Sequence, residues 1–399
     1  MSTPVKASCH CGLNSFTIPF TTDSLPVLND LCHCSSCRHA TGQLTVNYVP
    51  FPGVPLTSAT SEPADLKSTL TSYTIGPIAT RWFCRQCSAH ILWEYTNKDA
   101  PSQWCIAVGT LERTEGIVKT GYHIWISDTL DGGIADYFTA VDGLELPRYK
   151  ENLEPGDAAV LPAGWRSSAD TNAKSEDYLV EDTPSQDLLP ASCRCGAISF
   201  SITRPSEASA HPTSPYPDLI HPYHSTPADV IANPQDEKWW LRPAGAAKRT
   251  HYLAGHCACT TCRLTSGFEL QSWAIIPKAN ILVPRSSSAA AASVGKPPSP
   301  NELTELQLTD DALRPAGLRQ YKSSVGRNRE FCGTCGATSF WWSEDRPELV
   351  DVSVALFDEK AAGGVRAERW VEWWKGRVGF EEEAVNKTLV GAFSKEFKE

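Results

Sequence analysis

Two stretches of the sequence decide how the chain is organised: CHCSSCRHATG at residues 32–42 and CACTTCRLTSG at residues 257–267. Both carry a CxCxxC cluster that an arginine follows directly, and both end on a glycine. A CxCG motif precedes each stretch, at residues 9–12 and 193–196, and a CxxC motif follows each, at residues 84–87 and 332–335. Three cysteine clusters in the same order, twice over, indicate a tandem duplication.

The residues around the clusters repeat as well. CHCGLNSFTI matches CRCGAISFSI, and RWFCRQCSAHILW matches REFCGTCGATSFWW. We therefore predict a first domain over residues 1–150, an acidic linker rich in Pro and Ser over residues 151–187, and a second domain over residues 188–399. The second copy is longer, and we expect long insertions at about residues 203–250 and 285–316.

The pattern of apolar residues favours a mainly β fold. Short alternating runs recur in both copies, separated by Gly, Pro, Ser and Asn, and none of the segments shows a sustained helical stripe. Such runs include SFTIPF (15–20), QWCIAVGTL (103–111), AISFSI (197–202), ELQSWAIIP (269–277) and LVDVSVALF (349–357).

Composition and charge limit the classes of protein to which this chain can belong. The 399 residues include 15 cysteines, and the formal net charge is −10, which disfavours a nucleic-acid binder. No run of 18 apolar residues predicts a membrane span, and the first residues lack the apolar core of a secretory signal. We expect a cytoplasmic protein whose cysteines serve metal or redox chemistry rather than disulfides.

The CxCG and CxxC motifs of each copy together supply four sulfur ligands. Zinc prefers tetrahedral thiolate sites, so each pair predicts a closed, structural zinc site. These ligands would be Cys9, Cys11, Cys84 and Cys87 in the first copy, and Cys193, Cys195, Cys332 and Cys335 in the second.

Each CxCxxC cluster supplies only three sulfurs, which is the ligand number of catalytic zinc sites with an open position. The clusters are Cys32, Cys34 and Cys37, and Cys257, Cys259 and Cys262. Because thiolates are soft ligands, a substrate thiol would suit the open position. Two alternatives stay open: structural zinc alone, or an iron–sulfur cluster. The nearest spare ligand for such a cluster, Cys105, has no cysteine counterpart in the second copy.

These motifs, together with the later segment HIW at residues 123–125, resemble the glutathione-dependent formaldehyde-activating enzyme family, which includes centromere protein V. The likeness covers most of residues 8–148 and of residues 191–380 outside the insertions. It implies a β-tent fold of twisted antiparallel sheets, with one closed and one three-cysteine zinc site per domain. It also implies condensation of glutathione with formaldehyde to S-hydroxymethylglutathione, a carbon–sulfur lyase type of chemistry.

Two departures from the family pattern stand out. The usual chain has one domain, whereas this one carries a pair with long insertions in the second copy. After the CxxC motif, Ser88 stands in the first copy where Gly336 stands in the second. Neither departure removes a ligand. The insertions bear on the identity of the substrate, because loops beside a site commonly set what fits it.

Four residues are candidates for substrate contact. Arg38 and Arg263 directly follow the clusters, where they would pair with a substrate anion or neutralise the thiolates. His123 and Trp125, in GYHIWIS, would line the pocket or pack on the core. Cys105 lies in an alternating strand and is predicted to be a buried thiol. No general acid or base is predicted.

We therefore expect an enzyme with up to four zinc ions per chain, acting on glutathione, a glutathione adduct or another small thiol, with no nucleic-acid or membrane partner. The enlarged second copy suggests a substrate bulkier than formaldehyde. Two alternatives are a non-catalytic interaction module with zinc as its scaffold, and a pair of domains of which only one is active. The sequence predicts no oligomeric state.

Overall fold

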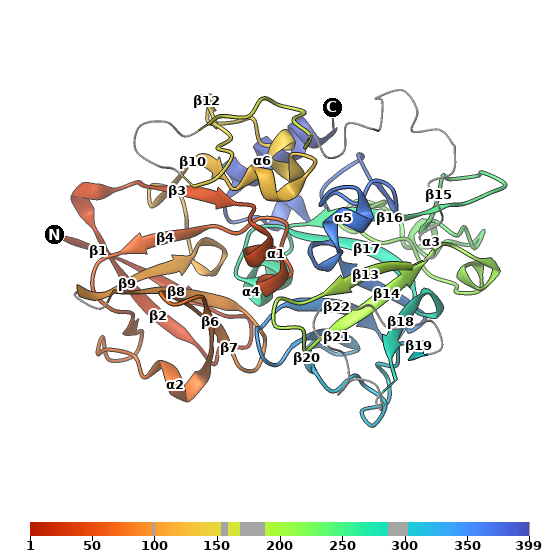
Figure 1. The fold of residues 1–399 in the computed structure, drawn as a ribbon, viewed down its shortest axis with the longest axis horizontal. Coiled ribbons are helices and arrows are strands. Elements are labelled where there is room, and N and C mark those ends of the chain that lie inside the picture. Colours follow the sequence, from red (N-terminus) through yellow and green to blue (C-terminus); the bar gives the residue numbers. More distant parts are fainter. Residues whose placement is uncertain (98–99, 153–158, 168–187, 286–301, 399) are drawn as a thin grey trace.

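The computed structural model describes residues 1–97, 100–152, 159–167, 188–285 and 302–398. Strands dominate and most pair antiparallel in several sheets, so the prediction of a mainly β fold is confirmed. The predicted linker at 151–187, and the part of the second insertion at 286–301, lie largely outside the described residues. We refer below to residues 1–152 as the N-terminal part and to residues 188–398 as the C-terminal part (Figure 1).

The N-terminal part contains short strands and helices only. Its strands are β1 (Ser2–Ser8), β2 (Ser15–Thr21), β3 (Val27–Cys32), β4 (Tyr48–Phe51), β5 (Leu56–Thr57), β6 (Leu70–Ile75), β7 (Ala79–Cys84), β8 (His90–Asn97), β9 (Ala100–Ala107), β10 (Val118–Ile124), β11 (Ala140–Val141) and β12 (Leu144–Glu145). Its helices are α1 (Ser35–Thr41) and α2 (Leu66–Thr69), with 3-10 turns η1 (Thr22–Ser24), η2 (Val108–Thr110), η3 (Ile126–Thr129) and η4 (Gly133–Tyr137).

The C-terminal part is built in the same way and adds a longer helix. Its strands are β13 (Leu188–Ser192), β14 (Ser199–Thr203), β15 (Leu241–Arg242), β16 (His251–Cys257), β17 (Gln271–Pro277), β18 (Ile281–Pro284), β19 (Leu303–Glu305), β20 (Leu318–Ser324), β21 (Arg327–Cys332), β22 (Thr338–Ser343), β23 (Leu349–Ser353) and β24 (Val371–Trp373). Its helices are α3 (Ala228–Ile231), α4 (Thr260–Ser266), α5 (Glu359–Ala362) and α6 (Lys387–Lys398), with 3-10 turns η6 (Glu207–Ala210), η7 (Lys278–Asn280), η9 (Val354–Leu356) and η10 (Glu381–Glu383).

The sheets of the two parts share one strand order. The order β4-β9-β8-β7-β6 in the N-terminal part corresponds to β17-β23-β22-β21-β20 in the C-terminal part. The strand before each CxCxxC cluster pairs in parallel with a late strand, β3 with β10 and β16 with β24. The parts differ because β16 also pairs with β17, which joins eight of the C-terminal strands into one sheet; β13, β14, β18 and β19 form a second sheet.

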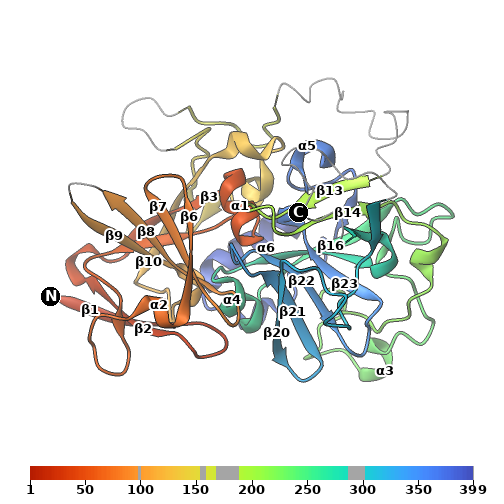
Figure 2. The same ribbon diagram turned by 60° about the horizontal axis from the view of Figure 1, so that its bottom comes forward.

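Helices α1 and α4 lie side by side between the sheets of the two parts (Figures 1 and 2). Each helix ends at a glycine with positive φ, Gly42 and Gly267, and each glycine packs on a backbone carbonyl of the other part, that of Thr338 and that of His90. The repeated glycine of the sequence is explained, because a side chain there would meet both a left-handed backbone and a neighbouring carbonyl.

The two parts also share hydrophobic packing. Phe138 of the N-terminal part packs on Phe393 of α6, with ring centroids 4.6 Å apart. Arg366 of the C-terminal part pairs with Asp136 at 2.9 Å. Helix α6 was missed in the sequence, where we found no helical stripe; its buried face consists of Leu389, Val390, Phe393, Ser394 and Phe397.

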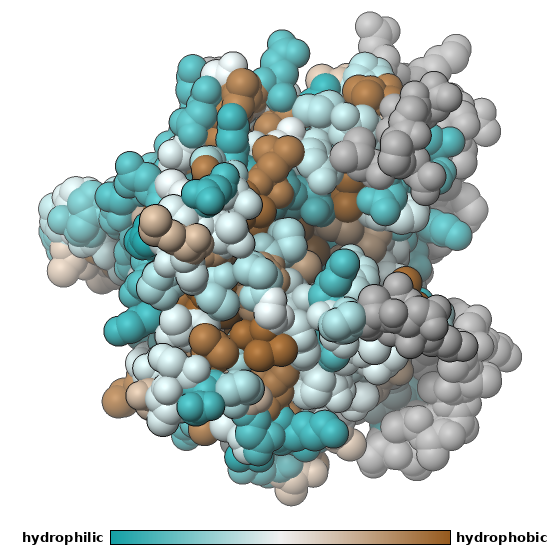
Figure 3. Space-filling view, turned by 90° about the vertical axis from the view of Figure 1, so that its left-hand side faces the viewer, coloured by the Kyte–Doolittle hydropathy of each residue, from teal (hydrophilic) through white to brown (hydrophobic). Residues whose placement is uncertain are grey.

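The face that carries the outer end of the N-terminal part shows hydrophobic patches broken up by hydrophilic side chains (Figure 3). In the described residues, none of the helices is both long and apolar enough to cross a membrane. The first insertion, at 203–250, contains the short elements η6, α3 and β15.

Candidate metal centres

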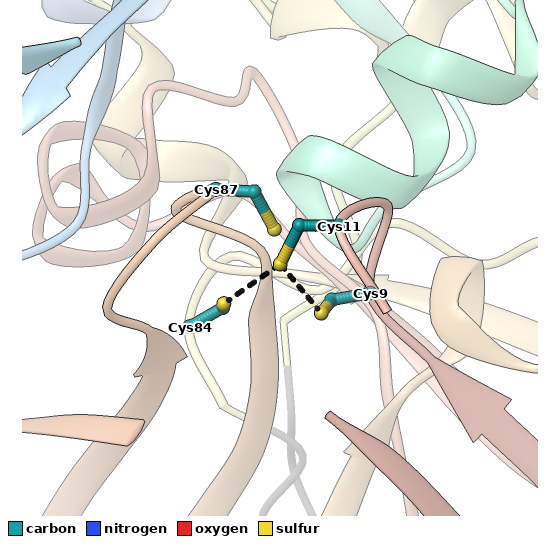
Figure 4. Close-up of side chains that lie close together, drawn as sticks. All are labelled: Cys9, Cys11, Cys84 and Cys87. Atoms are coloured by element: carbon teal, nitrogen blue, oxygen red, sulfur yellow. Dashed lines mark hydrogen bonds between the residues drawn. The ribbon is translucent and has the colours of Figure 1, made fainter. Parts of the chain in front are cut away.

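The first four-cysteine cluster joins two tight turns. Cys9 and Cys11 lie in the turn between β1 and β2, and Cys84 and Cys87 in the turn between β7 and β8. Their sulfurs point toward one another (Figure 4), with Cys11 Sγ 3.5 Å from Cys9 Sγ and 3.6 Å from Cys84 Sγ. Gly12, at φ +74°, allows the first turn to reverse within so few residues.

The second four-cysteine cluster is formed by the corresponding turns of the C-terminal part. Cys195 Sγ lies 3.4 Å from both Cys193 Sγ and Cys332 Sγ. The amide of Cys335 donates to Cys332 Sγ at 3.5 Å. All four sulfurs, including that of Cys335, lie within 4.8 Å of one another.

The three-cysteine clusters are formed where a strand runs into a short helix. Cys32 ends β3, Cys34 is the N-cap of α1, and Cys37 lies in its first turn, with Cys32 Sγ and Cys37 Sγ 3.6 Å apart. The amide of Cys37 donates to Cys34 Sγ at 3.3 Å. The second cluster has the same build, since the amide of Cys262 donates to Cys259 Sγ at 3.2 Å.

The geometry of all four clusters fits a metal ion bound by thiolates. Their sulfurs lie within 4.8 Å of one another in each cluster, and a tetrahedral zinc ion with Zn–S bonds of roughly 2.3 Å needs sulfurs about 3.8 Å apart. A disulfide would need about 2.05 Å, and all the cysteines are free. The clusters can therefore hold zinc, with four protein ligands in two of them and three in the other two.

An arginine that the sequence analysis missed lies beside each three-cysteine cluster. Arg81 on β7 donates from Nη2 to Cys37 Sγ at 2.8 Å. Arg329 on β21 donates from Nη2 to Cys262 Sγ at 3.4 Å. Both side chains are buried. The signal was present in the sequence, because RWFC and REFC place an arginine three residues before the CxxC motif in both copies.

A cavity of about 970 Å³ opens on the first three-cysteine cluster. Aromatic rings from four strands form much of its wall, and two acidic side chains, Asp30 and Asp128, also line it. The aromatic residues are Tyr48, Phe51, Trp93, Tyr95, Trp104 and Tyr122, joined by Trp125 beyond β10.

The cavity on the second three-cysteine cluster is smaller, about 300 Å³. The first insertion covers it, because Pro215, Pro217, Leu219 and Tyr223 line the cavity together with Phe380. This site is therefore narrower than the first cavity, and the expected substrate bulkier than formaldehyde stays a prediction.

The arginines that follow the clusters, Arg38 and Arg263, are not among the described residues that line either cavity. Arg38 donates to the carbonyl oxygens of His33 and Asp128, both at 3.0 Å, and lies 3.6 Å from Glu359 of the other part. Arg263 donates to the carbonyl oxygen of Gly109, also across the boundary. Both arginines connect the two parts, and their predicted contact with a substrate stays a prediction.

Of the two remaining candidates, Trp125 lines the first cavity and His123 does not. His123 is fully buried; its Nδ1 lies 2.9 Å from His33 Nε2, and its Nε2 lies 2.9 Å from the carbonyl oxygen of Phe138. Burial lowers the pKa of His123 to about 4, so it is neutral at pH 7. Cys105, expected in the core, is only partly buried and lines the first cavity; burial raises its pKa to about 12.

The model of a family described as glutathione-dependent formaldehyde-activating enzyme matches residues 4–128, and the C-terminal part lies outside this match. No curated protein and no solved structure matched the chain. The matched residues contain the CxCG, CxCxxC and CxxC motifs of both N-terminal clusters. Over residues 4–128, the chain is therefore similar to the glutathione-dependent formaldehyde-activating enzyme family.

Proposed function

We propose that this chain is a zinc-dependent enzyme of the carbon–sulfur lyase type, which makes or breaks a C–S bond of glutathione or a glutathione adduct. We further propose that it consists of two tandem zinc domains with the boundaries predicted above, each with one closed and one open zinc site. Metal binding needs free thiolates, so the proposal includes a reducing compartment such as the cytoplasm.

The main support for the proposal is that only one of the two kinds of cluster lines a cavity in the described part of the chain. Both three-cysteine clusters contribute cysteines to the wall of a cavity, Cys32, Cys34 and Cys37 to the larger one. The cysteines of the four-cysteine clusters are absent from the described lining of both cavities. The three cysteines of either open cluster would hold zinc with one position left for a substrate sulfur, and the bound ion would supply a lowered pKa for that thiol.

The residues around the first cluster would bind and orient the thiol. Arg81 keeps Cys37 in place and offsets the negative charge of three thiolates, since its guanidinium lies 2.8 Å from Cys37 Sγ. Its carbon Cζ lies 4.1 Å from the ring centroid of Trp93, which fixes the guanidinium plane. Aromatic walls such as Trp93 and Trp125 exclude water from the reacting thiol.

The test uses one cysteine-to-serine change in each three-cysteine cluster. With glutathione and formaldehyde as substrates, Cys34→Ser and Cys259→Ser should each remove the turnover of one cluster, and the double variant should show none. Formation of S-hydroxymethylglutathione is followed by NMR. Cys105→Ser is the matched control, because Cys105 lines the cavity outside every cluster. Turnover retained in both single variants and in the double variant would refute the proposal.

A further inference from the structure

The two cavities differ at one position of their shared sheet. Tyr48 on β4 pairs with Ala107, and Trp273 on β17 pairs with Ser353. Because β4-β9 and β17-β23 occupy corresponding places in the two sheets, Tyr48 and Trp273 are structural counterparts. Both line their cavities. A hydroxyl is therefore present in the first cavity where the second has an indole ring.

This difference leaves two nitrogens of the second arginine without a hydrogen-bond partner among the described residues. In the first cavity, Arg81 Nη1 donates to Tyr48 Oη at 2.8 Å. In the second, Arg329 has only its contact with Cys262 Sγ, and its Nε and Nη1 have no hydrogen-bond partner among the described residues. Arg329 is 5% exposed and lines the cavity. An unpaired buried guanidinium is costly, and a bound oxyanion would satisfy it.

The acidic side chains of the second cavity do not supply that partner, because each is paired with another arginine. The pairs are Asp345 with Arg327 at 3.0 Å, Asp351 with Arg346 at 2.7 Å, and Asp218 with Arg377 at 3.2 Å. Arg329 is thus the arginine of this cavity whose charge is not matched by a carboxylate within the described part of the chain.

In the first cavity the unpaired charges are acidic rather than basic. Asp30 and Asp128 line it, and neither forms an ion pair with lysine or arginine among the described residues. Arg81 is already engaged by Tyr48 and Cys37. An anionic group close to the first cluster would meet two carboxylates, whereas the same group near the second cluster would meet the guanidinium of Arg329, two nitrogens of which have no hydrogen-bond partner in the described part of the chain.

Size separates the cavities further. Ligand sites commonly measure roughly 300–1,000 Å³, and the two cavities, at about 300 and 970 Å³, lie at the two ends of that range. Leu219 from the first insertion packs directly on Gly255, where a Cβ would collide with its side chain. Gly255 stands two residues before Cys257, as Asp30 does before Cys32, so the glycine leaves room for the covering leucine.

We propose that the second three-cysteine cavity is a site for a compact thiol that carries a carboxylate or another anionic group, and that Arg329 recognises this group. The proposal rests on the proposed function, because it takes thiol binding at the three-cysteine clusters as given. The two cavities then differ in the thiol that they bind best: the second prefers a small anionic thiol, and the first prefers a larger one without an anion next to its sulfur.

Cobalt-substituted protein provides the test, because a thiol that binds cobalt changes its absorption. Mercaptoacetate and 2-mercaptoethanol, which are similar in size and differ in charge, are titrated into Cys34→Ser, which retains the second open cluster, and into Cys259→Ser, which retains the first. We expect mercaptoacetate to bind the second cluster roughly tenfold more tightly than 2-mercaptoethanol, as a charge-assisted hydrogen bond allows. At the first cluster we expect no such preference.

Two further variants of Cys34→Ser assign the preference to Arg329. Arg329→Gln removes the guanidinium, and Trp273→Tyr reproduces the hydroxyl that engages Arg81 in the other cavity; both should abolish the preference. Trp273→Tyr keeps the buried arginine. It therefore tests whether Arg329 causes the preference even if Arg329→Gln does not fold. The same preference at both clusters, or a preference that survives both variants, overturns the inference. No spectral change with any thiol at either cluster refutes the proposed function itself, and this inference with it.

Discussion

At the scale of single residues, contacts across the sheets define the sites more than neighbours in sequence do. Arg38 and Arg263 are predicted to contact the substrate because each directly follows the last cysteine of a cluster. In a helix, however, neighbouring side chains point in directions that differ by roughly 100°. They therefore reach the other part of the molecule. Arg81 and Arg329 are far from the CxCxxC clusters in sequence, and strand pairing brings them to the sulfurs.

The contact between Arg81 and Cys37 predicts a specific loss of metal affinity. Arg81→Gln should weaken metal binding at the first three-cysteine cluster by roughly 10–100-fold, as expected when a partner of a ligand is removed. Competition with a chromophoric chelator measures the affinity. The control is Arg85→Gln, because Arg85 is exposed in the following turn. Equal affinities in wild type and Arg81→Gln would show that the contact has no role in metal binding.

The burial of Glu269 predicts that the stability of the protein depends on pH. Burial raises the pKa of this carboxyl to about 7, and the nearby Arg263 only partly opposes the shift. The folded state then holds a proton that the unfolded state has lost above about pH 4.5, so this group makes stability fall as pH rises from about 4.5 to 7. Glu269→Gln should remove that fall and stabilise the protein at pH 8, by about 3 kcal/mol at most.

Urea unfolding of wild type and Glu269→Gln at pH 5 and pH 8 measures this difference. Subtracting the two proteins cancels the pH dependence of metal binding, which they share. Glu115→Gln, at an exposed position, is the control and should change stability equally at both pH values. A Glu269→Gln variant that gains no stability at pH 8 relative to pH 5 would contradict the assignment.

At the scale of elements, the ends of α1 and α4 hold the two parts together. Gly42 and Gly267 combine a positive φ with direct contact on a carbonyl of the other part. Gly42→Ala should therefore destabilise the protein by roughly 2–5 kcal/mol, the sum of backbone strain and steric overlap. Gly76→Ala is the matched control, since Gly76 has φ +70° and open space around it, and it should cost only about 1–2 kcal/mol.

Urea unfolding of the two glycine variants measures the difference. Because both substitutions introduce the same methyl group at a left-handed residue, a larger loss for Gly42→Ala isolates the contact with Thr338. Equal losses would mean that the close approach of α1 to the other part relaxes without cost.

The sequence predicts the strands of this molecule better than it predicts helix α6 or the narrowing of the second three-cysteine cavity. Alternating runs such as residues 15–20 and 197–202 fall in β2 and β14, because one buried face imposes a period of two. Helix α6 has only three turns, and its apolar stripe of Leu389, Phe393 and Phe397 was overlooked at the end of the chain. The narrowing of the second cavity by Leu219 depends on how the insertion folds back, which no local pattern records.

At the scale of the whole molecule, the core crosses the boundary between the parts. One hydrophobic cluster includes Leu31, Leu44 and Phe138 of the N-terminal part together with the core of the C-terminal part. The main chain is also bonded across the boundary in corresponding places, from His10 N to the carbonyl oxygen of Leu264 and from Arg194 N to that of His39. The two parts therefore depend on each other for stability.

This shared core predicts that the zinc-loaded chain unfolds in one step. Urea transitions followed by far-UV circular dichroism and by tryptophan fluorescence should coincide, and residues 1–152 produced alone should lack the sharp near-UV signals of packed aromatic rings. The full chain under the same conditions is the reference. Two separate transitions, or a natively packed fragment, would show that the parts are independent.

Each part is proposed to hold one closed and one open metal site. The most direct test is the metal content of the protein purified without a chelator, measured by plasma mass spectrometry against protein concentration. Our account predicts four zinc ions per chain, two of which are lost in the double variant Cys34→Ser, Cys259→Ser. Two zinc ions per chain in the wild type, unchanged in the double variant, would show that only the four-cysteine clusters bind metal and would contradict it.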